Sequence, residues 1–187
     1  MLGIGECPWR RRHPTRTGHG ARTEQLTVAS SLTWAIVTTP LGRFAIGGTE
    51  VAITTVLLPH EVSESDLDTD PSHLVGDAAR QLDEFVTGTR RTFDLALSSE
   101  GTVFQEAVWQ SLSMIDYGEI RSYGWVGDQV GSPKGPRAVG QALGKNPIPI
   151  FRPCHRVVGA SGLGGYGGGL ALKRALLELE GVDARYL

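Results

Sequence analysis

Apolar and polar residues alternate along the first patterned stretch of the chain, between residues 32 and 58. Three runs there are rich in β-branched residues, Thr33–Thr39, Arg43–Ile46 and Val51–Leu57, and the turn residues Pro40-Leu41-Gly42 and Gly47-Gly48 separate them. This alternation is typical of strands joined by short turns. The pattern predicts a small antiparallel meander.

The apolar period then lengthens to that of a helix. An acidic connector, Asp66 to Ser72, leads to a helix that begins at His73, with Ser72 or Asp70 as its cap and Gly88 beyond its end. Its inward residues are Leu74, Val75, Ala78, Ala79, Leu82 and Phe85. The stretch Arg91 to Leu97 alternates again, which indicates a return to the sheet.

The second half of the chain predicts helices. Thr102-Val103-Phe104-Gln105 is a capping box that opens a helix with Phe104, Ala107, Val108, Leu112 and Ile115 inward. A short helix over 124–130, a turn over Gly131–Pro136 and a helix from Arg137 to about Lys145 follow. The last of these buries Val139, Ala142 and Leu143. A final helix covers 170–180, with Leu172, Ala175, Leu176 and Leu179 inward.

The two helices around the glycine-containing turn form a helix-turn-helix pattern. Arg137, Gln141 and Lys145 recur every four residues on the face opposite the buried stripe. A basic outer face suits a nucleic-acid partner, although helical hairpins with an exposed basic face are also common in other proteins. The pattern alone therefore leaves both interpretations open.

Composition narrows the class of protein. Hydrophobic residues make up 40% of the chain and charged residues 20%, as in globular proteins. No apolar run approaches the roughly 18 residues of a membrane span, and the N-terminus lacks the apolar stretch of a secretory signal. Cys7 and Cys154 are the only cysteines, too few for a four-ligand zinc site. We expect a cytoplasmic protein without membrane contact and without a metal.

Charge is distributed unevenly, although the formal net charge is only −2. From Arg43 to Glu100, four arginines stand against eleven carboxylates, whereas from Arg121 to Arg156 six cations stand against Asp128 alone. The polarity suggests an acidic supporting half and a basic half that faces phosphates, or two unrelated solvated faces. Residues 1–27 include Arg10-Arg11-Arg12 and few apolar residues, so we expect a disordered basic tail.

One segment concentrates the candidate chemistry, Asn146-Pro-Ile-Pro-Ile-Phe-Arg-Pro-Cys-His-Arg-Val-Val158. Its three prolines exclude a helix and a central strand, which predicts a stiff, extended and buried segment that fixes Cys154 beside His155. A glycine-rich loop, Gly159–Gly169, follows and allows backbone to approach a ligand closely. It lacks the Lys-Ser/Thr ending of a phosphate loop, so nucleotide triphosphates are not the expected ligand.

These residues resemble those of the O6-alkylguanine-DNA alkyltransferases. Pro153-Cys-His-Arg-Val157 is similar to the family's active-site motif, and Arg137-Ala-Val-Gly140 with Asn146-Pro147 to its recognition helix and hinge. Further likeness lies in Phe104-Gln105, Val108-Trp109, Tyr117-Gly118, Ser122-Tyr123, Gly165-Tyr166, Gly168-Gly-Leu170 and Leu177-Glu-Leu-Glu-Gly181. The likeness runs from about Thr33 to Gly181 and is strong after Thr102.

The resemblance implies an α+β fold: a small N-terminal antiparallel sheet with a helix, and a mostly helical C-terminal domain with the helix-turn-helix and the active-site cysteine. We place the tail at 1–27 and the two domains at 28–98 and 99–187. The implied activity is direct DNA repair, in which O6-alkylguanine, and also O4-alkylthymine, is flipped out through the minor groove and its alkyl group moves irreversibly to the protein. The implied partner is double-stranded DNA that carries the lesion, bound by a monomer with cooperativity along DNA left open. No cofactor is implied.

The resemblance also implies a role for each matching residue. Cys154 is the nucleophile, His155 the base acting through a water, Glu180 the group that orients the imidazole, and Tyr123 the proton donor to guanine. Asn146 ties the recognition helix to the cysteine segment. Arg137 fills the space of the flipped base. The other implied DNA contacts are Ala138, Gly140, Gln141, Lys145 and Ser122, and the base pocket comprises Val157, Tyr166, Gly167 and Pro149. Lys145 and Arg152 are assigned to phosphate attraction.

Two other interpretations remain for this scaffold. A non-catalytic lesion binder would carry tryptophan in place of Cys154. A cysteine hydrolase would need an oxyanion hole and a path for water, which no motif marks. Taken singly, His155, Tyr123 and Arg137 would be ordinary core or surface residues.

Overall fold

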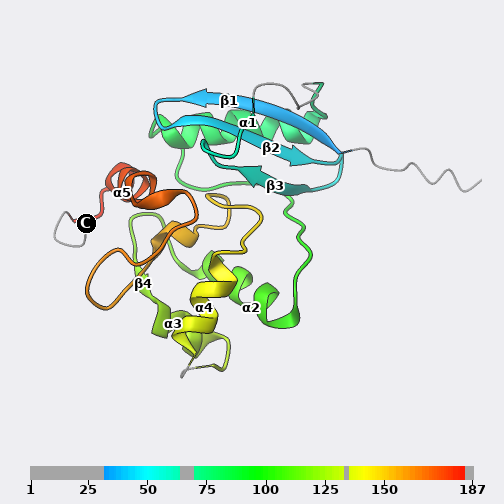
Figure 1. The fold of residues 1–187 in the computed structure, drawn as a ribbon. Helices are drawn as coiled ribbons and strands as arrows, with labels where there is room; N and C mark the ends of the chain where they lie inside the picture. Colours follow the sequence, from blue (N-terminus) through cyan, green and yellow to red (C-terminus); the bar gives the residue numbers. More distant parts are fainter. Residues whose placement is uncertain (1–31, 64–69, 133–134, 184–187) are drawn as a thin grey trace, which may run out of the picture.

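The computed structural model describes residues 32–63, 70–132 and 135–183 of the 187-residue chain. The predicted tail, most of the acidic connector, and Pro133 and Lys134 of the predicted turn lie outside these ranges. The fold is α+β, as predicted: a small antiparallel sheet with one helix on it, and further helices grouped below (Figure 1). None of the helices in the described part is long and apolar enough to cross a membrane.

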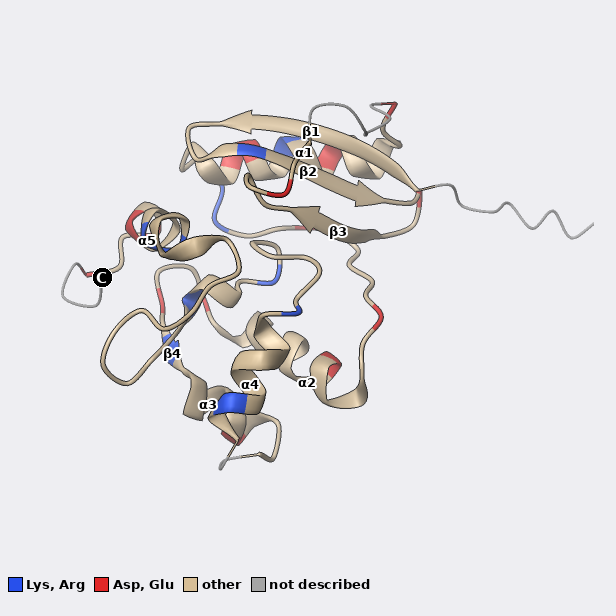
Figure 2. Ribbon diagram, viewed as in Figure 1, with Lys and Arg blue, Asp and Glu red and all other residues tan. Residues whose placement is uncertain are grey.

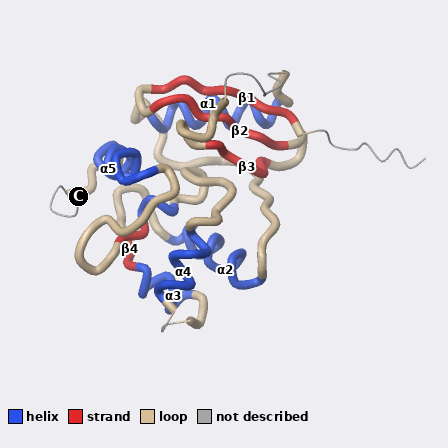
Figure 3. Tube along the Cα trace, viewed as in Figure 1, coloured by secondary structure: helices blue, strands red, loops and turns tan. Residues whose placement is uncertain are grey.

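The three predicted strands form one sheet in the order β1-β2-β3, with both neighbouring pairs antiparallel. Their bounds are Thr33–Thr39 for β1, Gly42–Gly48 for β2 and Ile53–Leu57 for β3, which confirms the predicted meander. The β1–β2 turn is tight because Gly42 adopts a φ of 117°, which only glycine accepts readily. Figure 3 shows how this sheet contrasts with the helical remainder.

Helix α1, His73–Val86, covers one face of the sheet. The predicted cap is confirmed, because the Ser72 hydroxyl accepts from the Val75 N–H. Val75, Ala78, Leu82 and Phe85 are fully buried, so this amphipathic stripe supplies much of the sheet's core.

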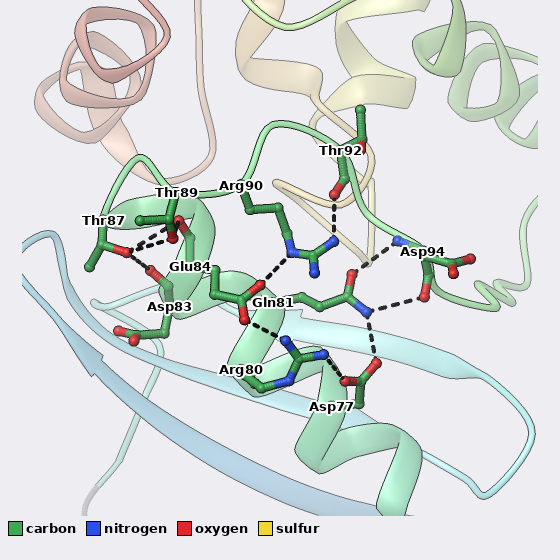
Figure 4. A network of polar contacts seen from close by, with 10 residues as sticks. All are labelled: Asp77, Arg80, Gln81, Asp83, Glu84, Thr87, Thr89, Arg90, Thr92 and Asp94. Atoms are coloured by element: carbon green, nitrogen blue, oxygen red, sulfur yellow. Dashed lines mark hydrogen bonds and ion pairs between the residues drawn. The ribbon is translucent and has the colours of Figure 1, made fainter.

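A polar network ties the end of α1 to the chain that returns from it (Figure 4). The buried amide of Gln81 accepts from the Asp94 N–H at 3.0 Å and donates to the Asp94 carbonyl at 3.2 Å and to Asp77 at 2.7 Å. Arg90 donates to Glu84 at 2.7 Å. These bonds hold Arg90 and Asp94 against α1, a few residues before the chain reaches β3 at Leu97.

The predicted return to the sheet is limited to one residue pair. Leu97 bridges Ile53, with the Ile53 N–H donating to Ala96 at 2.8 Å and the Ser98 N–H donating to Ile53 at 2.9 Å. The alternation over 91–97 therefore corresponds to a single backbone bridge to the edge strand β3 and not to a further strand of the sheet.

The predicted helices of the second half are all present. Helix α2, Val103–Ser111, has the complete Thr102/Gln105 capping box and passes into a 3₁₀ turn, η1, Leu112–Met114. Helices α3, Tyr123–Gln129, α4, Pro136–Leu143, and α5, Gly169–Leu179, follow. Helix α4 ends two residues before the predicted Lys145, since a residue that precedes a proline, as Asn146 does, disfavours helix.

One pairing was not predicted. The two-residue strands β4, Arg121–Ser122, and β5, Val157–Val158, lie parallel to one another. They join the start of α3 to the residues just after the cysteine turn. The segment that carries Cys154 is thereby fixed from its C-terminal side.

The cysteine segment lies between two apolar clusters. Ile148, Ile150 and Phe151 complete the cluster formed by the sheet and α1. Cys154 and Val157 belong instead to the cluster of α2, α3 and α4. The Val56 N–H of β3 also donates to the Pro147 carbonyl at 2.9 Å. The segment is therefore held by both halves of the fold.

Candidate active site

The cysteine segment is buried, as predicted, but it is not extended. The Arg152 N–H donates back to Ile148 at 2.9 Å, and Cys154–Arg156 forms a single 3₁₀ turn, η2. Prolines exclude a helix that needs every N–H, yet they permit a turn closed by the Arg156 N–H on the Pro153 carbonyl at 3.0 Å. The prediction of extended backbone was wrong for this reason.

Packing holds the segment in a strained conformation. Ile150 adopts a φ of 73°, which is rare for a β-branched residue, and its side chain is 1% exposed in the sheet cluster. Asn146 braces the same turn: its side chain donates to the Arg152 carbonyl at 3.0 Å and accepts from the Ile148 N–H at 3.1 Å. Strain held by packing and hydrogen bonds is typical of positions where one side chain must be aimed.

A buried carboxylate organises the residues beside Cys154. Glu180 Oε1 lies 2.7 Å from His155 Nε2, and both side chains are inaccessible to solvent. The Arg156 guanidinium donates to both Glu180 oxygens at 2.9 to 3.1 Å, and the Gly118 N–H donates to Oε2 at 3.0 Å. Burial alone would raise the pKa of Glu180, but the bonds from His155 and Arg156 lower that pKa on balance. The carboxylate is therefore ionised.

An ionised Glu180 fixes the tautomer of His155. A carboxylate only accepts, so Nε2 carries the proton that it donates to Glu180. The other ring nitrogen, Nδ1, is left with a lone pair and has no hydrogen-bond partner among the described residues. Burial lowers the pKa of His155, and the imidazole is neutral near pH 7. It can therefore accept a proton at Nδ1.

The thiol of Cys154 is 8% exposed, and burial raises its pKa. A hydrogen bond from Asn146 and the charge of Lys173 act in the opposite direction. The resting group is a neutral thiol that needs a base in order to react, since the thiolate is the nucleophile.

Lys173 is a residue of the site that the apolar pattern missed. It is fully buried and donates to the carbonyls of Val157 at 2.6 Å, Leu163 at 2.5 Å and Gly165 at 3.2 Å. It thereby ties the glycine-rich loop to the strand after the cysteine turn. Burial lowers the pKa of Lys173 to about 8.

Tyr123 completes the connection to the loop. Its hydroxyl donates to the Gly165 carbonyl at 3.3 Å, and burial raises its pKa. Gly164 adopts a φ of 68°, and a Cβ there would meet the Tyr123 ring at 2.8 Å. Glycine is therefore required for the loop to approach this tyrosine.

A cavity of about 480 Å³ opens on Cys154. Its lining comprises Tyr123, Pro136, Arg137, Gly140, Leu143, Gly144, Cys154, Gly165, Tyr166 and Gly167. This volume lies within the range of roughly 300–1,000 Å³ for small-ligand sites. Cys154, Tyr123 and Arg137 therefore share one cavity; they are the predicted nucleophile, the predicted proton donor and the residue predicted to fill the space of the flipped base. Pro149 lines a smaller adjoining cavity, whereas Val157 is fully buried, lines neither of these two cavities and has its carbonyl bound to Lys173.

Other predicted DNA contacts lie on the outer face of α4 and beside it. Arg137, Ala138, Gln141 and Lys145 are exposed, whereas the buried stripe is Val139, Ala142 and Leu143, as predicted. The basic residue of α4 in Figure 2 is Arg137. Ser122 is exposed and caps α3, its hydroxyl accepting from the Trp125 N–H at 3.1 Å.

The basic half presents fewer cations than its composition suggests. Arg152 donates to the Ser99 hydroxyl at 2.7 Å and its side chain is only 12% exposed, so its assignment to phosphate attraction was wrong. The guanidinium of Arg156 forms an ion pair with Glu180 inside the protein. Among the described cations of this half, Arg137 and Lys145 are the exposed pair.

Residues 103–182 match the family model described as 6-O-methylguanine DNA methyltransferase, DNA binding domain. The methylated-DNA–protein-cysteine methyltransferase of Mycobacterium tuberculosis is 46% identical over 148 residues, which cover 77% of this chain and 89% of that protein. The constitutive enzyme of that name from Bacillus subtilis is 44% identical over 155 residues, 78% of this chain and 93% of the relative.

Solved structures agree with these relatives. The crystal structure of M. tuberculosis O6-methylguanine methyltransferase matches with a TM-score of 0.72 and 42% identity, over 80% of this chain and 93% of that one. A structure of M. tuberculosis OGT in complex with DNA matches with a TM-score of 0.72 and 44% identity, over 79% and 92% of the two chains.

Proposed function

This chain belongs to the methylated-DNA–protein-cysteine methyltransferase family, a family of DNA-repair enzymes, and from that premise we propose that Cys154 takes the alkyl group of O6-alkylguanine and keeps it. The observation that supports this most directly is the position of Cys154 on the wall of a base-sized cavity, beside the buried His155–Glu180 pair. The sequence interpretation and this geometry both support the proposal.

The reaction is a displacement at carbon. His155 Nδ1 takes the thiol proton, directly or through one water, and the sulfur attacks the carbon bonded to O6. A C–S bond forms, and the C–O bond breaks with its electron pair remaining on the guanine oxygen. Guanine takes up one proton from the Tyr123 hydroxyl on the cavity wall, and the proton that His155 took returns to Tyr123 through solvent, so no proton is gained or lost overall. The alkyl group stays on the sulfur as a thioether, so each protein molecule reacts once.

DNA is the macromolecular partner. The M. tuberculosis relative has been crystallised in complex with DNA, and here α4 offers Arg137, Ala138, Gln141 and Lys145 on its outer face. Gly140, on the same helix, lines the cavity. We assign α3 and α4 to the helix-turn-helix and Arg137 to the space that the flipped base leaves. The protein acts as a monomer, and O4-alkylthymine is a second substrate.

Mapping the adduct tests the proposal. After incubation with duplex DNA that contains O6-methylguanine, mass spectrometry should find the peptide with Cys154 heavier by one CH₂ group, at one group per protein molecule. Unmodified protein that still binds would indicate a lesion binder, and repeated turnover of an ester or amide would indicate a hydrolase. Either result would overturn the proposal.

Replacing Arg137 by alanine is expected to slow repair of duplex DNA by roughly tenfold or more, because extruding a paired base costs a few kcal/mol. Reaction with free O6-benzylguanine, which needs no extrusion, should change much less. Single-turnover rates on both substrates measure the difference. Arg80→Ala removes an exposed arginine of α1 and serves as the control. Equal losses on the two substrates would contradict the assignment of Arg137 to the space that the flipped base leaves.

The rate of transfer is expected to stay level between about pH 6.5 and pH 7.5, which spans the usual histidine pKa and neutrality. Burial raises the pKa of Cys154 and lowers that of His155, so in this window both groups rest neutral. A proton that moves within the pair leaves the total number of bound protons unchanged. Below this window the imidazole gains a proton and the rate should fall.

Single-turnover rates across this range, with circular dichroism to follow the fold, measure the profile. A tenfold rise for each pH unit would mean that solvent ionises the thiol first and that His155 is not the base.

A further inference from the structure

Arg152 carries a largely buried charge that the proposed reaction does not use. Its side chain is 12% exposed, and it lies outside the lining of the cavity at Cys154. Its Nη1 donates to the Ser99 hydroxyl at 2.7 Å and lies 3.8 Å from Glu106 Oε2. The Ser99 hydroxyl in turn donates to the Glu106 carboxylate, 2.9 and 3.0 Å from its two oxygens. Because removing a guanidinium from water costs free energy that a well-packed apolar side chain would not cost, stability alone does not explain an arginine here.

The backbone of Arg152 belongs to the turn that carries Cys154. Its carbonyl accepts from the Cys154 N–H at 2.7 Å and from the Asn146 side chain at 3.0 Å. Its N–H donates to the Ile148 carbonyl at 2.9 Å. Both backbone groups of Arg152 are therefore bound within the turn, and a contact that fixes its side chain also fixes the position of Cys154.

The side chain of Arg152 is connected to helix α4 through one tryptophan. The guanidinium lies over the Trp109 ring, 5.7 Å from its centroid, which is within the range of about 6 Å for an attraction between a cation and an aromatic face. Trp109 is 2% exposed, and its indole N–H donates to the Ala142 carbonyl of α4 at 2.8 Å. A Cβ at Gly101 would meet the same ring at 2.7 Å, so the linker confines the ring as well. Trp109 thus joins the Cys154 turn to the helix assigned to DNA.

The spacing between α4 and the Cys154 turn matters most for a base that is still part of DNA. Arg137 and Gly140 of α4 line the same cavity as Cys154. A base joined to a strand that α4 holds can meet the sulfur only if α4 and the turn keep a fixed spacing, whereas a free base can settle against the sulfur by itself. A displacement of about 1 Å can lower a rate by about a hundredfold.

We propose that Arg152 is a positioning residue that sets the spacing between the Cys154 turn and α4 for substrates held on DNA, an inference that rests on the function proposed above. Arg152 contacts neither the base nor the sulfur. It acts through its backbone on the turn and through Trp109 on α4.

Single-turnover kinetics of Arg152→Met test the inference, because methionine keeps the apolar stem and removes the guanidinium. Rates at increasing concentrations of duplex with O6-methylguanine separate the maximal rate from the half-saturating concentration. The maximal rate is expected to fall roughly tenfold or more, whereas the half-saturating concentration and the rate with free O6-benzylguanine should change by less than about twofold. Equal losses of rate on the duplex and on the free base would overturn the inference.

Two further variants separate positioning from a general loss of stability. Arg152→Lys keeps a donor for Ser99 and a cation over Trp109, so it should recover most of the lost duplex rate. Arg90→Met removes an arginine that is 24% exposed and paired with Glu84 in the N-terminal half. It should lower stability to urea and leave the ratio of the duplex rate to the free-base rate unchanged. A ratio that falls with stability in the Arg90 variant as well would overturn the inference.

A double-mutant cycle tests the connection through Trp109. Trp109→Phe keeps an aromatic ring and removes the N–H that donates to Ala142. Because this substitution and Arg152→Met break the same connection, the double variant should be no more than about twofold slower on duplex than the slower single variant. Losses that multiply would contradict the connection. Ser99→Ala, which removes the acceptor for the guanidinium, gives the same cycle if circular dichroism shows that the Trp109 variant is unfolded.

A lesion placed opposite an abasic site separates positioning from extrusion of the base. An unpaired base costs less to extrude, so the loss expected for Arg137→Ala should shrink on this duplex. The loss for Arg152→Met should persist, since the reacting carbon must still reach the sulfur. A loss for Arg152→Met that disappears on this duplex would assign Arg152 to extrusion and overturn the inference.

The wild-type protein separates the two possible failures. Methyl transfer by the wild type, with the same ratio of duplex to free-base rates in Arg152→Met, would overturn the inference and leave the proposed function standing. Absence of methyl transfer by the wild type would overturn the proposed function, and the inference with it.

Discussion

Replacing Cys154 by alanine is expected to abolish alkyl transfer while leaving DNA binding intact. The sulfur is the atom that forms the new bond, and alanine offers no electron pair in its place. Of the residues assigned to DNA, Ala138, Gln141, Lys145 and Ser122 are exposed and lie outside the lining of the Cys154 cavity, so loss of the sulfur leaves these contacts in place. Mass spectrometry after incubation with O6-methylguanine duplex should find no adduct, and fluorescence anisotropy should find binding close to that of the wild type.

The chain contains a matched control for this substitution. Cys7→Ala removes the other cysteine and should leave both transfer and binding unchanged. A full methyl adduct on the Cys154→Ala protein would place the nucleophile elsewhere. Complete loss of binding would mean that Cys154 also supports the fold of the DNA-binding face, in addition to its role in the reaction.

Replacing Glu180 by glutamine is expected to lower both stability and transfer. The carboxylate accepts from His155, Arg156 and the Gly118 N–H inside the protein. Glutamine keeps the volume but removes the charge, which leaves the Arg156 guanidinium buried without a counter-ion. Breaking such a pair costs about 3–5 kcal/mol of unfolding free energy. His155 also loses the group that fixes its tautomer, so we expect transfer to slow by about a hundredfold or more.

Urea unfolding and single-turnover kinetics measure the two losses. Glu178→Gln, an exposed change on the same helix, should alter stability by less than about 0.5 kcal/mol. A Glu180→Gln protein with wild-type kinetics would remove the orienting role, whatever its stability.

Lowering the pH should reduce the difference in unfolding free energy between the wild type and Glu180→Gln. The folded-state pKa of Glu180 lies below its usual value of 4.5, because the bonds from His155 and Arg156 outweigh the effect of burial. Its stabilisation is therefore complete above that value and is lost as pH falls through the folded-state pKa. The gap in unfolding free energy should narrow in this acidic range.

Local patterns were sufficient for much of the fold. Turn residues separated the three strands correctly, and the Thr102/Gln105 box marked the start of α2, because both features depend on neighbours in the chain. The pairing of Arg121 with Val157 could not be predicted, since two-residue strands carry no period. The turn at Cys154 was missed because prolines exclude a helix without specifying what replaces it.

Helix α5 shows why Lys173 was missed and why Glu180 was found through the family resemblance and not through the apolar pattern. An apolar stripe was expected along Leu172, Ala175, Leu176 and Leu179. Leu176 is fully buried and Leu172 and Leu179 pack partly buried against the sheet cluster, as expected, but Lys173 and Leu177 are fully buried as well, with Glu180 buried at the cap. From the sequence alone, a helix face with lysine at one end and glutamate at the other is expected to be exposed to solvent. Only their partners, the loop carbonyls for Lys173 and the His155–Arg156 pair for Glu180, explain why the two charges lie inside.

The packing of the cysteine segment bears on the proposed domain boundary near residue 98. Ile148, Ile150 and Phe151 follow that boundary in sequence, yet they fill the cluster beneath the sheet. A fragment that began at residue 99 would leave these three side chains facing water and would release the strained backbone at Ile150. The sheet therefore holds the reactive loop in its conformation. Cleavage of the chain between the two halves is expected to abolish alkyl transfer, although Cys154 itself is unchanged.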